Sequence, residues 1–289
     1  MAISAAMVKE LRERTGLGMM DCKRALTEAD GDMEKAIEEL RKKSALKAAK
    51  KAGRTTANGL LGIHVAADGT RGAIVEVNIE TDFAAKNEKF IAFVSKVTEK
   101  LFESADGDLA VLAAGDLNAE RETLVQEIGE NITIRRGEVV ASAAGGISEY
   151  MHGDQRRGAL VNLAEANAEL GRDIAMHVVA INPMVVRSED VAPDVLAKER
   201  EIFTSQAAES GKPEDIVVKM VEGRVKKFLA EVSLLDQPFV KDGDIKVGKL
   251  VANAGTEVLS FVRYEVGEGI EVEETDFAAE VAAQVAGND

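Results

Sequence analysis

The sequence predicts an α+β protein with a helical unit at its N-terminus and a duplicated core. Between residues 57 and 140, segments of alternating polarity typical of strands are interrupted by apolar residues at helical spacing. The segment Arg71-Gly72-Ala73-Ile74-Val75 then recurs as Arg157-Gly158-Ala159-Leu160-Val161. Each copy follows a turn and precedes a loop and a helical pattern, so we expect two related subdomains in tandem.

Residues 1–44 predict three short helices. The segment Gly16-Leu17-Gly18 supplies the turn between the first two, and Met19-Met20 follow it as an exposed apolar pair. A unit of this size has a small core, so it suits recognition by packed helices better than catalysis. The residues placed to cap the three helices are Ser4, Asp21 and Asp32.

A basic stretch follows the third predicted helix. Residues 41–54 contain Lys and Arg but no acidic residue, and residues 45–56, rich in Lys and Ala, are expected to form a linker. This gives an N-terminal domain of residues 1–55. The basic stretch is either a solvated helix end and linker or a contact with RNA or an acidic partner surface, and the sequence leaves both interpretations open.

The two core subdomains are expected at residues 56–140 and 141–265. Period-2 alternation and turn residues predict their strands, and apolar spacing predicts their helices. The expected elements of the first subdomain are strands 60–65 and 72–79, helices from 86 to about 102 and from about 119 to 129, and a strand from 132. Those of the second are a strand at 157–161, a helix at 173–180 and strand-like segments between 231 and 264, including 260–264.

An antiparallel helical hairpin is expected within the second subdomain, at about residues 188–236. Pro193 and Pro213 each stand near the first turn of a helical pattern, where a missing N–H costs nothing. Because only Ser210-Gly211-Lys212 joins the two patterns, the helices must fold back on each other and project from the core. A C-terminal module of residues 266–289 is expected to contain a helix from Asp276 to Val285.

Composition narrows the class of protein. The net charge is −15 and Trp is absent, which disfavours DNA or broad nucleic-acid binding and favours a soluble partner with basic patches. No apolar run is long enough to span a membrane, and residues 1–15 lack the apolar stretch of a signal peptide. The single cysteine, Cys22, fits a reducing compartment and is expected to be buried. We therefore expect a cytoplasmic protein.

The usual patterns of catalytic and metal sites are missing from the sequence. Residues 243–250 match Gly-x4-Gly-Lys, but Leu250 stands where a phosphate loop needs a Ser or Thr hydroxyl for Mg²⁺. A Gly-Asp turn between two short strands is the better interpretation. The histidines His64, His152 and His177 are far apart, and no Cys-x-x-Cys or nucleophile elbow is present. The sequence thus favours a protein that is not an enzyme, with no metal and no cofactor.

The hexapeptide Glu80–Ala85 joins a predicted strand to a predicted helix. It places Phe83 at a strand-to-helix corner, either as a plug for its own core or as a wedge aimed at a partner. The second subdomain has Ala166–Glu169 near the equivalent place, so the corner is not needed merely to complete the fold. The same six letters recur at Glu274–Ala279, where Phe277 is expected either to dock a terminal helix onto the core or to add a peripheral partner contact.

Several motifs, in order along the chain, resemble the bacterial elongation factor Ts family. They are Thr15–Lys23, Glu80–Asn87, Ile128–Ile132, Val221–Arg224 and Phe261–Gly269. The resemblance implies a guanine-nucleotide exchange factor for elongation factor Tu. It also implies a ubiquitin-associated-like (UBA-like) N-terminal domain, a core of two subdomains, a helical hairpin and a C-terminal helical module.

The resemblance further implies which residues contact elongation factor Tu. The segment that disturbs Mg²⁺ in the GTPase is Thr81, Asp82, Phe83 and Ala84, and the other contacts are Leu11, Met19, Met20, Ile128, Gly129 and His152. Such a factor need not touch the nucleotide itself, and the hairpin offers a route to a homodimer. The alternative is a UBA-like scaffold that binds a partner without exchanging nucleotide.

Overall fold

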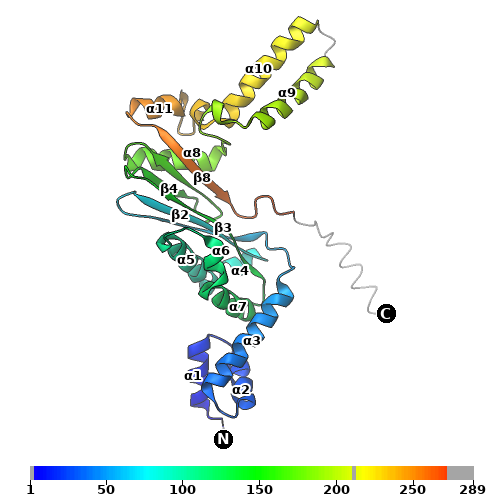
Figure 1. Ribbon diagram of the computed structural model, residues 1–289, viewed down its shortest axis with the longest axis vertical. Coiled ribbons are helices and arrows are strands. Elements are labelled where there is room, and N and C mark those ends of the chain that lie inside the picture. The colour runs from blue at the N-terminus through cyan, green and yellow to red at the C-terminus, as the bar shows by residue number, and fades with distance from the viewer. Residues whose placement is uncertain (1–2, 210–212, 272–289) are drawn as a thin grey trace.

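The computed structural model describes residues 3–209 and 213–271 and combines helices with two main sheets (Figure 1). Three N-terminal helices lie at one end, a helical hairpin projects at the other, and the sheets lie between them. The predicted connection Ser210–Lys212, the second hexapeptide and the predicted terminal helix lie outside the described residues.

The N-terminal unit contains α1 (Ala5–Thr15), α2 (Met19–Glu28) and α3 (Met33–Lys51). Ser4 caps α1 as predicted, because its Oγ accepts a hydrogen bond from the Met7 N–H at 3.3 Å. The predicted Asp21 cap of the second helix is wrong. Gly18 is the N-cap, so Met19-Met20 form the first turn of α2 rather than a loop before it.

The predicted linker is largely helical. The third helix, α3, continues through Lys51, because Ala and Lys are strong helix formers and Ala48 is buried against the first core subdomain. Ser44 is buried as well, and its Oγ donates to Gln126 Oε1 at 2.6 Å. The same helix therefore belongs to the N-terminal unit and rests on the core.

The first subdomain is an antiparallel sheet in the order β1-β2-β3 with helices on one face. Phe90 and Phe93 of α5 are buried against the odd-numbered residues of β2. The predicted strands and the two longer helices are present, but α4 and α6 were not predicted. The bounds are β1 (Asn58–Val65), β2 (Arg71–Ile79), α4 (Asp82–Ala85), α5 (Glu88–Glu103), α6 (Leu109–Ala114), α7 (Asp116–Ile128) and β3 (Ile132–Ala141).

The second subdomain repeats this plan with the order β4-β5-β8. The strand-like pattern predicted across 231–264 is wrong at α11, where buried Val247 and Val251 form one side of a short helix. The predicted Gly-Asp turn is also wrong, because Gly243 lies within β7. Gly248 lies within α11 and packs against Leu235. The bounds are β4 (Ile147–Met151), β5 (Arg157–Leu163), α8 (Ala168–Ile181), β6 (Pro238–Phe239), β7 (Asp242–Lys246), α11 (Val247–Asn253) and β8 (Val258–Glu265).

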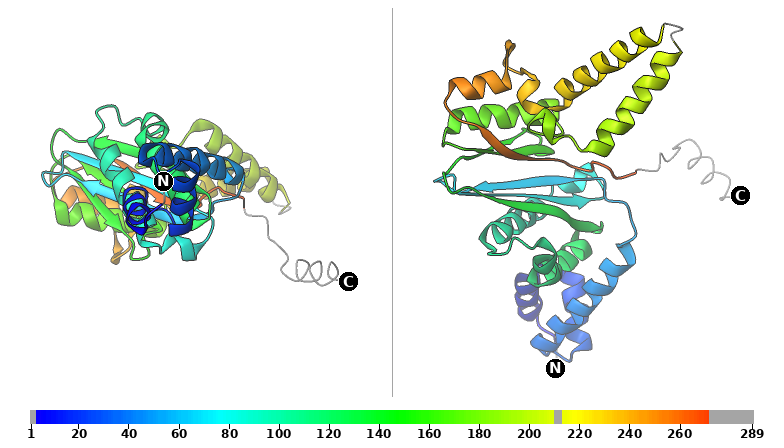
Figure 2. Two further views of the ribbon diagram at one scale, coloured as in Figure 1. Left: turned by 90° about the horizontal axis from the view of Figure 1, so that it is seen from below. Right: turned by 45° about the horizontal axis from the view of Figure 1, so that its top comes forward.

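The two sheets pack face to face, with helices on both outer sides (Figure 2). The repeated Arg-Gly-Ala segments meet in this layer. A side chain at Gly72 would contact Ile147 and Leu160, and one at Gly158 would contact Ile63. Equivalent glycines therefore let each subdomain approach the other, which supports the expected duplication.

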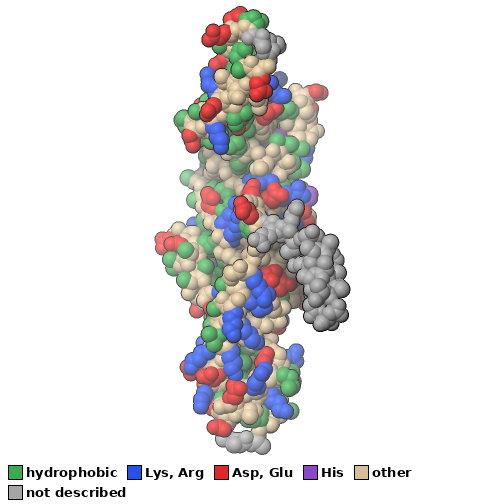
Figure 3. Space-filling model, turned by 90° about the vertical axis from the view of Figure 1, so that its right-hand side faces the viewer, with side chains coloured by type: hydrophobic (Ala, Val, Ile, Leu, Met, Phe, Trp, Pro, Cys, Tyr) green, Lys and Arg blue, Asp and Glu red, His purple; other side chains and the backbone are tan. Residues whose placement is uncertain are grey.

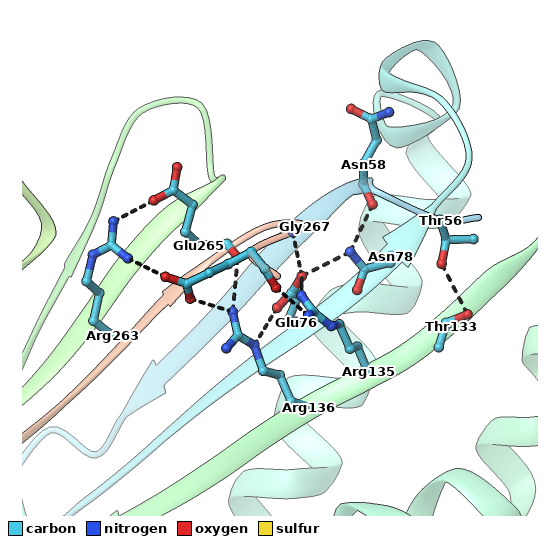
Figure 4. Close-up of polar contacts among 11 residues, drawn as sticks. Thr56, Asn58, Glu76, Asn78, Thr133, Arg135, Arg136, Arg263, Glu265 and Gly267 are labelled. Atoms are coloured by element: carbon cyan, nitrogen blue, oxygen red, sulfur yellow. Dashed lines mark hydrogen bonds and ion pairs between the residues drawn. The ribbon is translucent and has the colours of Figure 1, made fainter. Parts of the chain in front are cut away.

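A buried carboxylate joins three segments within the same layer (Figure 4). Glu76 is fully buried and receives hydrogen bonds from Arg136 Nε at 2.6 Å, Arg135 Nη1 at 2.9 Å, Asn78 Nδ2 at 3.0 Å and the Gly267 N–H at 2.8 Å. Burial raises its pKa, but these donors outweigh burial and hold the pKa below its ordinary value. The network fixes the chain that follows β8 onto β2 and β3.

The hairpin consists of α9 (Pro193–Ala208) and α10 (Glu214–Val232), between the short 3₁₀ turns η1 (Ser188–Asp190) and η2 (Leu234–Asp236). Its helices pack on each other through Ala207, Val221 and Val225, a cluster separate from the core of the second subdomain. Leu234 of η2 belongs to that core instead. The projecting part is thus narrower than the predicted 188–236.

Candidate partner-binding surface

The corner after β2 presents Phe83 to solvent. Thr81 is the N-cap of α4, and its Oγ1 accepts a hydrogen bond from the Ala84 N–H at 3.2 Å. Ala84 and Ala85 face inward and join the core of the first subdomain, whereas the Phe83 side chain is 81% exposed. The interpretation of Phe83 as a core plug is therefore wrong.

A lysine lies over the exposed ring. Lys86 Nζ is 5.4 Å from the centre of the Phe83 ring and 2.9 Å from Asp82 Oδ2. The hydrogen bond from Lys86 lowers the pKa of the Asp82 carboxyl. The exposed turn thus carries an aromatic face flanked by one negative and one positive side chain.

The loop between α7 and β3 lies beside this corner. Gly129 ends α7 with φ of 89°, a left-handed conformation that favours glycine, and leaves Ile128 half-buried at the helix end. Glu130 accepts hydrogen bonds from Thr81, at 2.9 Å from its N–H and 2.8 Å from Oγ1. Of the predicted contacts, Ile128 and Gly129 are therefore placed next to Thr81–Ala84.

The N-terminal unit exposes two methionines near the same region. Met19 is 45% and Met20 74% exposed at the start of α2. The preceding loop rests on the first subdomain, because Lys89 at the beginning of α5 donates to the Gly16 carbonyl at 3.5 Å and pairs with Glu127 of α7. These contacts bring the start of α2 toward the corner after β2.

Leu11 and His152 are placed differently from the other predicted contacts. Leu11 is fully buried in the N-terminal core, so it supports the start of α2 and does not itself reach a partner in this conformation. His152 follows β4 in the second subdomain. Its loop contacts β1, because the Leu61 N–H donates a hydrogen bond to the Gln155 carbonyl at 2.8 Å. Within the described residues, no hydrogen bond or ion pair joins His152 to the corner.

Basic side chains gather at the end of the molecule where α1–α3 lie (Figure 3). Several of them form contacts within the chain. Lys43 pairs with Glu28, Lys51 donates to the Gly129 carbonyl, and Arg54 lies 3.4 Å from Glu80. Part of the basic stretch therefore fastens α3 to α2, to the α7–β3 loop and to the corner after β2.

Sequence reasoning missed the carboxylates of Glu80 and Glu130. The signal for them is the pairing of β2 with β3, in which Ile79 lies opposite Ile132. The residues just beyond this pair must face one another across the ladder. In the described residues, no group of three or more His, Cys, Asp or Glu side chains is arranged to hold a metal ion, and no helix is long and apolar enough to cross a membrane.

Known proteins are similar to this chain over almost its whole length. The profile of the family described as "Elongation factor TS" matches residues 80–268. The chain is 58% identical over 286 residues to elongation factor Ts of Hahella chejuensis and 55% identical over 286 residues to that of Saccharophagus degradans, with 99% of each protein covered. It is 52% identical over 291 residues to elongation factor Ts of Methylococcus capsulatus. The chain therefore belongs to the elongation factor Ts family of translation elongation factors.

Proposed function

We propose that this chain is a guanine-nucleotide exchange factor that binds elongation factor Tu, displaces its Mg²⁺ and promotes release of GDP. The observation that carries this proposal is the exposed Phe83, 81% accessible on a capped turn whose other side is buried in the core. Membership of the elongation factor Ts family supports the choice of partner. The Mg²⁺ belongs to the GTPase, so the factor uses no metal or cofactor of its own.

Exchange of this kind requires differential binding. The factor must bind the nucleotide-free GTPase more tightly than the GDP-bound form, and linkage makes GDP weaken factor binding by the same amount. A buried aromatic at the centre of an interface contributes up to a few kcal/mol. If Phe83 enters between helices that position Mg²⁺ and phosphate, this energy shifts those helices and raises the rate of GDP dissociation. The chain makes and breaks no covalent bond, so we propose that it is not an enzyme.

The remaining contacts would hold the GTPase while the wedge acts. Met19 and Met20 suit an apolar partner surface because their flexible side chains adapt to irregular shapes. Ile128 and Gly129 lie beside the wedge, and Leu11 acts through the packing of α2. His152, on the second subdomain, is proposed as a separate contact. The N-terminal helices are proposed to be a UBA-like domain, the hairpin to be a route to homodimers, and the protein to work in the cytoplasm.

Release of a fluorescent GDP analogue from elongation factor Tu tests this function. A catalytic amount of the chain should accelerate release, and the chain alone should show no saturable binding of the analogue. A stable complex without accelerated release would instead support the scaffold interpretation, which the exposed methionine pair also allows. Tight nucleotide binding by the isolated chain would contradict the mechanism.

A further inference from the structure

We propose that Glu130 is a positioning residue for Phe83 and that Glu80 and Glu130 together form a reciprocal clasp around the corner. The inference rests on the proposed exchange function. The clasp begins where the β2–β3 ladder ends, at the pair Ile79 and Ile132. Beyond this pair the two backbone segments no longer exchange backbone hydrogen bonds, and side-chain carboxylates accept the backbone N–H groups instead.

Each carboxylate accepts a hydrogen bond from a backbone N–H of the opposite segment. Glu130 Oε2 accepts from the Thr81 N–H at 2.9 Å, and Glu80 Oε1 accepts from the Asn131 N–H at 2.6 Å. Glu80 is anchored in turn by Arg54, at 3.4 Å. Hydrogen bonds to an ionised acceptor are stronger than neutral ones, so the clasp fixes both chains together.

The clasp determines the direction of the turn that carries Phe83. Thr81 Oγ1 donates to Glu130 Oε1 at 2.8 Å, which orients the hydroxyl so that its lone pairs accept from the Ala84 N–H at 3.2 Å. Ala84 and Ala85 hold one side of the turn through burial. Glu130 holds the other side, where the exposed ring has no core packing of its own. The turn that carries the ring is thereby ordered before a partner arrives, which lowers the entropy cost of binding.

The second subdomain shows that the fold does not require carboxylates at this place. After β5 the equivalent connection is held by two hydrogen bonds. The Ala164 N–H donates to the Glu257 carbonyl at 2.9 Å, and the Glu165 N–H donates to Thr256 Oγ1 at 2.9 Å. These are neutral acceptors, and no aromatic projects from that connection. The charged clasp therefore occurs in the copy that presents Phe83.

The test compares GDP release from elongation factor Tu at saturating factor for the wild-type chain, Glu130→Ala, Glu130→Gln and Thr256→Val. Thr256→Val is the matched control, since it removes the acceptor at the equivalent corner. We expect Glu130→Ala to lower the maximal rate about tenfold, equivalent to about 1.4 kcal/mol. Glu130→Gln, which keeps one acceptor, should recover part of that loss, and Thr256→Val should match the wild type.

A double-mutant cycle separates positioning from a structural role. If Glu130 acts through Phe83, adding Glu130→Ala to Phe83→Ala should cause no further loss. A wild-type rate in Glu130→Ala, or the same fold loss with and without Phe83, would overturn the proposal. Amide hydrogen exchange of the Ala84 N–H in the free chain gives a readout independent of the GTPase. Faster hydrogen exchange of this amide in Glu130→Ala supports the clasp even if the wild-type chain proves inactive in GDP release. Unchanged protection of this amide contradicts the clasp.

Discussion

Replacing Phe83 with alanine should strongly lower the rate of nucleotide exchange while sparing the fold. Because the side chain is 81% exposed, its loss should cost the free chain roughly 0.5 kcal/mol or less. A fully covered aromatic buries roughly 150–250 Å². At about 25 cal/mol per Å², the share left exposed in the free chain is worth roughly 3–5 kcal/mol in a complex. The lower figure corresponds to a loss of about a hundredfold in the second-order rate of exchange.

Stopped-flow release of a fluorescent GDP analogue across a series of factor concentrations measures this loss, and thermal melts measure stability. Val111→Ala is the matched control, since it removes another exposed apolar side chain, 67% accessible, from α6. Phe90→Ala provides the opposite reference, because Phe90 is fully buried and its removal should cost about 3–5 kcal/mol of folding free energy. A Phe83→Ala protein that exchanges normally, or that melts as low as Phe90→Ala, would refute the reasoning.

Three further predictions concern the rest of the chain. Glu76→Gln should destabilise the fold by about 3–5 kcal/mol, because Arg135 and Arg136 lose their buried partner. Since the folded pKa of Glu76 lies below 4.5, the stability that its carboxylate contributes is complete above about pH 5 and is lost as the pH falls through the folded pKa. Melting temperatures measured from pH 6 to pH 3 should therefore depend less on pH in the variant than in the wild type. Deleting residues 192–231 with a short Gly/Ser bridge should leave a cooperatively melting, active core, and an unfolded product would show that the hairpin seam supports the body. Phe277→Ala should weaken affinity or stability modestly but keep the maximal rate of GDP release; a loss equal to that of Phe83→Ala would show that the wedge is misassigned.

Much of the architecture could be predicted because it depends on local patterns. The repeated Arg-Gly-Ala segments predicted two similar subdomains, and the paired prolines predicted the hairpin helices. The orientation of Phe83 could not be decided from the sequence, since an aromatic at a strand-to-helix corner suits either a core or a surface. It is decided by Ala84 and Ala85, which fill the inward side of the turn.

The errors occurred where tertiary contacts override local signals. Residues 247–253 contain Val247, Leu250 and Val251 and resemble a strand, yet Val247 and Val251 are buried on one side of α11, against the core of the second subdomain. The predicted linker at residues 45–56 is helical as far as Lys51, because Ala48 is buried in the core of the first subdomain. The clasp of Glu80 and Glu130 depends on the pairing of two strands that lie about 50 residues apart, which no local pattern specifies.

The duplicated core provides an internal comparison for the role of the corner. Both subdomains pass from the middle strand to a helix, and both tie that connection to the residues before the third strand. The second does so with neutral groups, and its α8 is capped directly by Asn167. The first adds a separate capped turn, a charged clasp and an exposed ring. Since the same topology forms without these additions, their contribution lies in what the corner presents rather than in the stability of the fold. That is why Phe83 and Glu130, and not the buried residues around them, should control the rate of exchange.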